Sequence, residues 1–104
     1  MSEFVLVAKT SDIPDPGTSL VEVDQQPIAL FHAGGQFYAL DDVCTHDDGP
    51  LVEGVLEGNE VACPRHGAKF DIKTGAALTM PATRATRVHE VQVKGQDVYV
   101  KLCE

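Results

Sequence analysis

Basic residues are scarce in this chain of 104 residues, which has 8 lysines and arginines against 16 aspartates and glutamates and a formal net charge of −8. A nucleic-acid-binding protein needs a basic face to displace counterions from phosphates, so this balance excludes nucleic acid as a partner. Cysteine is also scarce, at three residues. A secreted domain held by disulfides favours an even number of cysteines at paired spacings, and this chain lacks that pattern.

Long apolar runs are missing as well. No segment approaches the roughly 20 apolar residues that cross a bilayer. Residues 1–9 carry no basic stretch, and their apolar run is too short for a signal peptide. We therefore expect a cytoplasmic protein without membrane contact, folded as one domain over residues 1–104.

Short strands separated by turn residues dominate the pattern, and no stretch keeps a helical period for three turns. Gly34-Gly35 is a strong hairpin signal, because adjacent glycines accept the positive φ angles of a type I′ turn. Residues 10–17 contain two prolines and a glycine, which predict a loop. The predicted strands cover residues 4–9, 18–23, 27–32, 36–40, 60–62, 69–72, 88–94 and 98–102. This predicts an all-β fold of roughly nine strands.

Two short Cys/His pairs carry the chemistry of the chain. They are Cys44-Thr45-His46 and Cys63-Pro64-Arg65-His66, each followed by glycine- or proline-containing sequence. Two thiolates with two imidazoles suit either zinc or an iron–sulfur cluster. The spacing C-x-H…C-x-x-H also satisfies the Rieske rule, in which two histidines replace two cysteines on one iron of a [2Fe–2S] centre.

Both pairs resemble the cluster-binding loops of Rieske-type [2Fe–2S] proteins. The first loop reads C-T-H-D-D-G-P-L from Cys44, the second reads C-P-R-H-G from Cys63, and Gly75 and Pro81 continue the resemblance. In length the chain is similar to the ferredoxins of bacterial ring-hydroxylating (aromatic) dioxygenase systems. The resemblance implies an antiparallel β-sandwich with a small cluster-binding subdomain over about residues 41–70.

The resemblance also implies a ligand set and a role. Cys44 and Cys63 would bind one iron as thiolates, and His46 and His66 would bind the other as neutral imidazoles. The chain would then carry one electron at a time and have no catalytic residue of its own. It would pass electrons from a flavin-dependent NAD(P)H reductase to a terminal Rieske non-haem iron oxygenase, as a monomer that meets both partners transiently.

The reduction potential is predicted to lie at the low end of the Rieske range of about −150 to +300 mV. Rieske proteins of respiratory cytochrome complexes have a disulfide where this chain has Gly49 and Arg65, and hydrogen-bond donors where it has Ala68 and Phe70. Without those donors, fewer hydrogen bonds stabilise the electron-rich reduced cluster, and this lowers the reduction potential. The two aspartates after His46 repel the added electron as well.

Seven acidic residues gather around the first loop. They are Asp41, Asp42, Asp47, Asp48, Glu53, Glu57 and Glu60. One interpretation is a solvated loop that needs charge for solubility. The other is an electronegative docking surface, which would speed encounter with a partner of opposite charge and keep the complex short-lived.

Two alternatives to the ferredoxin interpretation stay open. One is a small Rieske-like redox subunit of another oxidoreductase, such as a nitrite reductase. The other is a structural zinc module, because Cys₂His₂ is a common tetrahedral zinc set, although the first pair is spaced more tightly than usual. The remaining candidates are interpreted as structural or left open: Cys103 as a spare thiol, His32 and His89 as ordinary surface or edge histidines, Pro81 as a cluster shield or a strand terminator, and Arg65 as a docking or solvated side chain.

Overall fold

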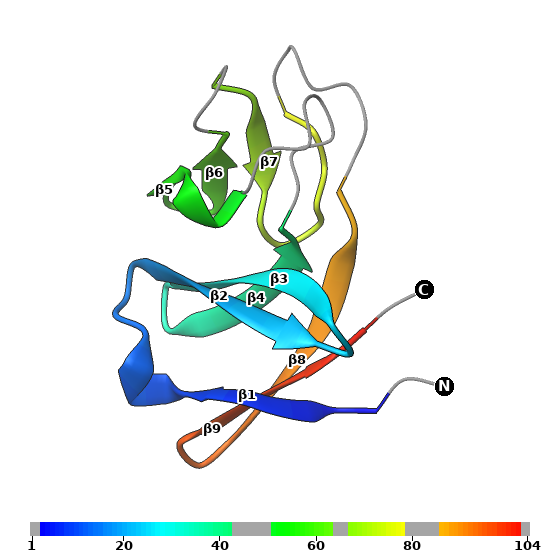
Figure 1. Cartoon of the computed structure of the whole chain (residues 1–104). Coiled ribbons are helices and arrows are strands. Elements are labelled where there is room, and N and C mark those ends of the chain that lie inside the picture. The colour runs from blue at the N-terminus through cyan, green and yellow to red at the C-terminus, as the bar shows by residue number, and fades with distance from the viewer. Residues whose placement is uncertain (1–2, 43–50, 64–66, 79–85, 103–104) are drawn as a thin grey trace.

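Two antiparallel sheets make up the fold (Figure 1), seen in a computed structural model that describes residues 3–42, 51–63, 67–78 and 86–102. The larger sheet has the strand order β1-β9-β8-β4-β3-β2 and the smaller one β5-β6-β7. The large sheet contains β1 (Val5–Lys9), β2 (Gly17–Val23), β3 (Gln26–Ala33), β4 (Gln36–Asp41), β8 (Val88–Lys94) and β9 (Asp97–Lys101). The small sheet contains β5 (Val55–Glu57), β6 (Glu60–Ala62) and β7 (Lys69–Asp71). The predicted all-β fold is confirmed.

Strand β3 separates two hydrophobic cores. Ala29 and Phe31 are buried in the core shared with the small sheet, whereas Ile28 and Leu30 are buried inside the large sheet. Successive side chains of a strand point to opposite faces, so β3 is covered on both faces. The large sheet curls far enough for its edge strands β1 and β2 to contact each other. In Figure 1 the small sheet lies over the β2–β4 side, opposite β1 and β9.

The β3–β4 hairpin forms where the sequence predicts it. Gly34 and Gly35 have φ angles of 61° and 80°, as a type I′ turn requires. The prediction of a loop over residues 10–17 is wrong in part, because a 3₁₀ turn spans Thr10–Asp12 and β2 begins at Gly17. A carboxylate oxygen of Asp12 accepts a hydrogen bond from the backbone N–H of Lys9 at 3.0 Å, which favours that turn.

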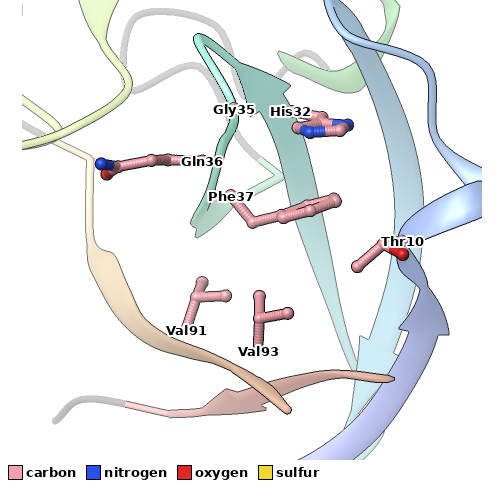
Figure 2. A pocket seen from close by; sticks show the side chains of 7 residues that line it. All are labelled: Thr10, His32, Gly35, Gln36, Phe37, Val91 and Val93. Carbon is pink, nitrogen blue, oxygen red and sulfur yellow. The ribbon is translucent and has the colours of Figure 1, made fainter. Parts of the chain in front are cut away.

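The large sheet has a narrow seam between β4 and β8. These strands pair only at Ala39–His89 and Leu40–Val88, whereas β3 and β4 pair at six positions. Beyond the seam the strands separate around a cavity of about 450 Å³, lined by Phe37 of β4 and by two valines of β8 (Figure 2). The two halves of the sheet, β1-β9-β8 and β4-β3-β2, therefore pair with each other mainly at the end of β4 that leads into the first Cys/His loop.

The helical content consists of short 3₁₀ turns, Thr10–Asp12 (η1) and Leu51–Glu53 (η2), among the described residues. Within those same ranges, no helix has the length and apolar character needed to cross a membrane.

Candidate metal centre

Of the four predicted ligands, Cys63 is the one within the described residues. Cys44, His46 and His66 lie outside them, as do Arg65, Pro81 and Cys103. Cys63 directly follows β6 and is 2% exposed. Its neighbours in the buried core include Leu51, Ala68 and Phe70, so Cys63 lies on the face of the small sheet that packs into the core.

Backbone hydrogen bonds hold both ends of the second Cys/His loop. The N–H of Cys63 donates to the carbonyl of Ala68 at 2.7 Å, and the N–H of Gly67 donates to the carbonyl of Cys63 at 3.0 Å. Gly67 has a φ of 76°, a conformation that glycine adopts without steric cost. This local geometry fixes the backbone from which the Cys63 side chain extends.

The ends of the first Cys/His loop are held to each other and to the large sheet. Asp42 lies just before this loop and Val52 just after it. The Asp42 carboxylate accepts a hydrogen bond from the backbone N–H of Val52 at 2.8 Å. The hydroxyl of Thr18 on β2 donates to the carbonyl of Val52 at 3.1 Å. Leu51, next to this brace, is fully buried in the same core as Cys63. The flanks of the two Cys/His loops therefore meet at one core.

A third segment, residues 79–85, has flanks on the same small sheet. The N–H of Leu78 donates to the carbonyl of Lys69 on β7 at 2.8 Å, and the N–H of Thr86 donates to the carbonyl of Gly75 at 2.8 Å. The segment that contains Pro81 thus begins and ends beside β7 and the turn after it.

Ala68 and Phe70 are both fully buried beside Cys63 in this core. Neither side chain has an N–H or O–H group, so neither donates a hydrogen bond to sulfur. These two neighbours therefore add no side-chain hydrogen bond that would stabilise added negative charge on a thiolate ligand.

The interpretation of His32 and His89 as ordinary surface or edge histidines is wrong. The His89 side chain is fully buried, and its Nε2 lies 2.6 Å from Oδ1 of Asp41. His32 Nδ1 lies 2.8 Å from the carbonyl oxygen of Ile13, and its ring stacks on Phe37 with centroids 3.9 Å apart. Both histidines lie on interior strands of the large sheet and have defined partners.

The acidic cluster around the first loop divides into two groups. Asp41 and Asp42 are half-buried, and their carboxylates contact Nε2 of His89 and the N–H of Val52, so they are less available to a partner than exposed acidic residues. Glu57 and Glu60 are exposed and directly opposite each other on β5 and β6, and Glu60 is opposite Asp71 on β7. Like charges placed opposite each other destabilise a sheet, and this row crosses all three strands of the small sheet. We call Glu57, Glu60 and Asp71 the acidic row. Glu53 is exposed too, and Asp47 and Asp48 lie outside the described residues.

A family model for the Rieske [2Fe-2S] domain matches residues 3–100 of the chain. The chain belongs to the Rieske [2Fe–2S] family. Its cofactor is therefore a [2Fe–2S] cluster, and the structural zinc alternative is excluded. This Rieske chain has its buried Cys63 where the flanks of the Cys/His loops meet, and a thiolate donor suits such a cluster.

Curated relatives of this Rieske chain are ferredoxin subunits. It is 41% identical over 102 residues to the 3-phenylpropionate/cinnamic acid dioxygenase ferredoxin subunit of Shigella boydii, covering 96% of this chain and 94% of the relative. The subunit of the same description from Photorhabdus laumondii is also 41% identical over 101 residues, covering 96% and 95%. The expected resemblance to dioxygenase ferredoxins is confirmed.

Solved structures agree with the Rieske fold. The ferredoxin of carbazole 1,9a-dioxygenase from Nocardioides aromaticivorans superposes with a TM-score of 0.90 at 28% identity, over 93% of this chain and 95% of that one. A chain of the complex of reduced oxygenase and oxidized ferredoxin in carbazole 1,9a-dioxygenase gives a TM-score of 0.88 at 39% identity, over 93% and 91%.

Proposed function

We propose that this protein is a one-electron carrier that takes electrons from a flavin-dependent NAD(P)H reductase and delivers them to a terminal Rieske non-haem iron oxygenase. The observation that carries the proposal is the 41% identity, over 96% of the chain, to a dioxygenase ferredoxin subunit. A similar chain in a complex of an oxygenase with a ferredoxin supports the oxygenase as the electron acceptor. The protein has no turnover alone and works in the cytoplasm, where its reductase finds NAD(P)H.

Four residues hold the cluster in this proposal. Cys44 and Cys63 bind one iron as thiolates, and His46 and His66 bind the other as imidazoles. The shared core beneath the flanks of both Cys/His loops supports this assignment, because the described flanks of the two loops pack into or beside that one core. The cluster supplies a site for one electron. Residues 41–70 form the cluster-binding subdomain of a single domain that spans residues 1–104.

Docking is transient and electrostatic, and the carrier acts as a monomer so that one face serves both partners in turn. The acidic row supports this part of the proposal. Glu60 is three residues before Cys63 along β6, which corresponds to about 10 Å of extended strand. A basic partner surface on the acidic row would therefore lie close to the cluster loops, and opposite charge raises the rate of encounter.

Stopped-flow spectroscopy with the reductase and the oxygenase tests the proposal. The visible absorption of the cluster should bleach when the reduced reductase is mixed in and return when the oxygenase is added. Both rate constants should fall several-fold between about 50 and 500 mM salt, because the Debye length shrinks several-fold over that range. Failure of both proteins to exchange electrons with the cluster would refute the carrier role.

Matched charge variants test the docking surface separately. The double variant Glu57→Gln/Glu60→Gln should slow electron transfer at low salt and leave the reduction potential within error. The double variant Glu22→Gln/Glu90→Gln removes the same charge from exposed positions on the large sheet and should have little effect. Equal slowing by both pairs, or rates that ignore salt, would refute the acidic row as the docking site while leaving the carrier role intact.

A further inference from the structure

Asp41 ends β4, just before the first Cys/His loop, and three contacts join it to Arg87 and to His89, around the start of β8. Its N–H donates to the carbonyl of Arg87 at 2.9 Å. Its Oδ1 lies 2.6 Å from Nε2 of His89, and its Oδ2 lies 4.0 Å from Nε of Arg87. The next residue, Asp42, braces the far end of the same loop through Val52. Hydrogen bonds of Asp41 therefore connect the start of the first Cys/His loop to Arg87 and to His89 of β8. The hydrogen bond of Asp42 connects the two ends of that loop to each other.

The Asp41–His89 contact is a charge-assisted hydrogen bond with one defined orientation. An ionised carboxylate only accepts hydrogen bonds, so Nε2 of His89 carries the hydrogen and donates it. The His89 side chain is fully buried, and that of Asp41 is 26% exposed. In low-dielectric surroundings such a bond is stronger than in water, and leaving either partner unpaired is costly. The two side chains therefore hold β4 and β8 in a fixed relation.

The Asp41–His89 pair lies where a relative shift of β4 and β8 would move the first Cys/His loop. Strand pairing between the halves of the large sheet is confined to the two residue pairs of the β4–β8 seam, and these two strands part around the cavity beyond it (Figure 2). Asp41 lies at the joined end, where β4 leads toward Cys44. A shift of one half against the other would therefore displace the start of the first Cys/His loop.

We infer that Asp41 and His89 form a positioning clamp for the cluster. They fix the first Cys/His loop against β8 and thereby set the geometry and the reduction potential of the cluster. They act through the loop as positioning residues. The inference rests on the proposed function, because it takes Cys44 and His46 in that loop as ligands.

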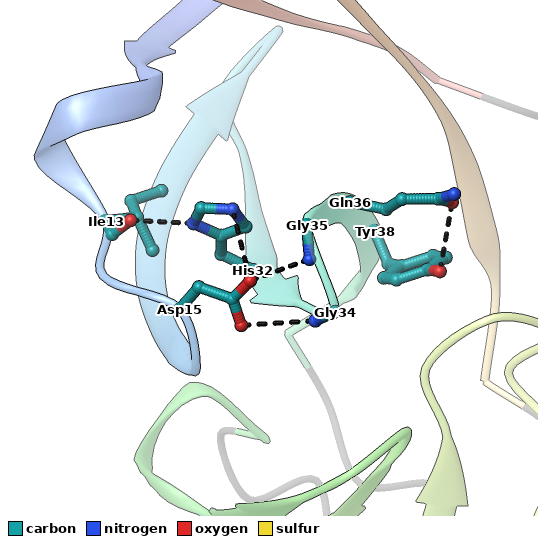
Figure 3. A network of polar contacts seen from close by, with 7 residues as sticks. All are labelled: Ile13, Asp15, His32, Gly34, Gly35, Gln36 and Tyr38. Carbon is teal, nitrogen blue, oxygen red and sulfur yellow. Dashed lines mark hydrogen bonds and ion pairs between the residues drawn. The ribbon is translucent and has the colours of Figure 1, made fainter.

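A second Asp–His pair in the molecule serves as a matched control. Nε2 of His32 lies 3.8 Å from Oδ2 of Asp15, and Asp15 also accepts hydrogen bonds from the N–H groups of Gly34 and Gly35 (Figure 3). This pair lies at the turn end of the β3–β4 hairpin, whereas Asp41 lies at the other end. Its loss should disturb the hairpin turn without displacing the cluster loop.

The test compares cluster-loaded variants of both pairs. Asp41→Asn and His89→Phe remove the charge and the donor, respectively, and His89→Gln keeps a donor. Redox titration should show that Asp41→Asn and His89→Phe each change the reduction equilibrium constant at least about threefold, which is ~28 mV for a one-electron couple. Asp41→Asn should move the potential upward, because one negative charge near the added electron is removed. The reduced-state EPR g values should change with both variants.

His89→Gln should restore the wild-type potential within error, and the controls Asp15→Asn and His32→Gln should leave potential and g values unchanged. The double variant Asp41→Asn/His89→Phe should shift the potential less than the sum of the single shifts, because residues in contact are not additive. Variants of Asp41 or His89 that melt cooperatively but lose iron, while the controls keep it, also support the clamp.

Unchanged potentials and g values in Asp41→Asn and His89→Phe would overturn the clamp. Equal shifts in the control pair would overturn it as well, as would loss of fold together with iron, because the pair would then be an ordinary stabilising contact. The wild-type protein separates this failure from that of the proposed function. A wild type without a [2Fe–2S] spectrum refutes the proposed ligands, whereas a loaded wild type with unaffected variants refutes the clamp alone.

Discussion

Gly75 gives a quantitative test of how the small sheet is connected to the chain before β8. It has a φ of 76°, and a Cβ atom added there would lie 2.2 Å from the backbone oxygen of Thr86. Its N–H donates to the carbonyl of Asp71 at 2.7 Å, and its carbonyl accepts a hydrogen bond from Thr86. The backbone cannot move away from an added methyl group without weakening these bonds. Gly75→Ala should therefore be strongly destabilising.

The magnitude follows from three contributions. A left-handed conformation costs an L-residue about 1–2 kcal/mol, and overpacking costs about 1–3 kcal/mol. Replacing glycine by alanine also restricts the unfolded chain, which offsets about 0.4–1 kcal/mol. The net loss for Gly75→Ala is about 1–5 kcal/mol, and its central value of about 3 kcal/mol corresponds to roughly 12–24 °C in melting temperature for a domain of this size.

Two other glycines separate the conformational cost from the steric cost. Gly58 has a φ of 58° with no atom within 4 Å of an added Cβ, so Gly58→Ala should cost about 1 kcal/mol or less. A Cβ at Gly54 would lie 2.1 Å from the backbone oxygen of Ala62 without a positive φ, so Gly54→Ala should show the steric cost alone. Circular dichroism melts at one scan rate should rank the losses Gly58→Ala, Gly54→Ala, Gly75→Ala in increasing order. A Gly75→Ala protein that melts as high as Gly58→Ala would refute the reasoning.

Three further substitutions test the core, the potential and the leftover cysteine. Leu51→Ala should lower the unfolding free energy by about 2–5 kcal/mol because Leu51 is fully buried. Leu20→Ala, at a 56% exposed position, is the control. Similar losses for both variants in denaturant titrations would contradict the prediction. Phe70→Tyr should raise the reduction potential by up to roughly 60–130 mV, because a hydroxyl donor to sulfur is worth about 1.5–3 kcal/mol and 1.4 kcal/mol equals ~59 mV. Redox titration checks this, with Phe37→Tyr in the other core as control; equal potentials in the wild type and Phe70→Tyr would argue against a sulfur atom in reach. Cys103→Ser should keep the full iron content per chain, and a loss of iron would show that Cys103 is needed for cluster binding.

Local signals account for the parts of the fold that the sequence predicts well. Gly34-Gly35 favours the type I′ turn that the structure shows, and the predicted strand at residues 88–94 has the observed bounds of β8. The sequence does not predict strand β5, because it has three residues and its exposed position 55 holds an apolar valine, so Val55-Leu56-Glu57 shows no alternation of apolar and polar residues. Its pairing with β6 is what makes it a strand.

The long-range contacts of the site could not be predicted in the same way. His89 lies in a strand-like run, and its partner Asp41 is 48 positions away in the sequence. The Asp42 brace is likewise set by the return of the chain to Val52. Both aspartates fall in an acidic stretch that suggests a solvated surface, and only the fold shows that their carboxylates contact His89 and Val52.

Pulsed EPR of the dithionite-reduced protein is the most direct test of the central claim, that imidazoles hold one iron of the cluster and thiolates the other. The account predicts hyperfine coupling to two histidine nitrogens, with an average g value well below that of all-cysteine [2Fe–2S] clusters. A reduced spectrum without nitrogen coupling, or one with the g values of an all-cysteine cluster, would contradict it.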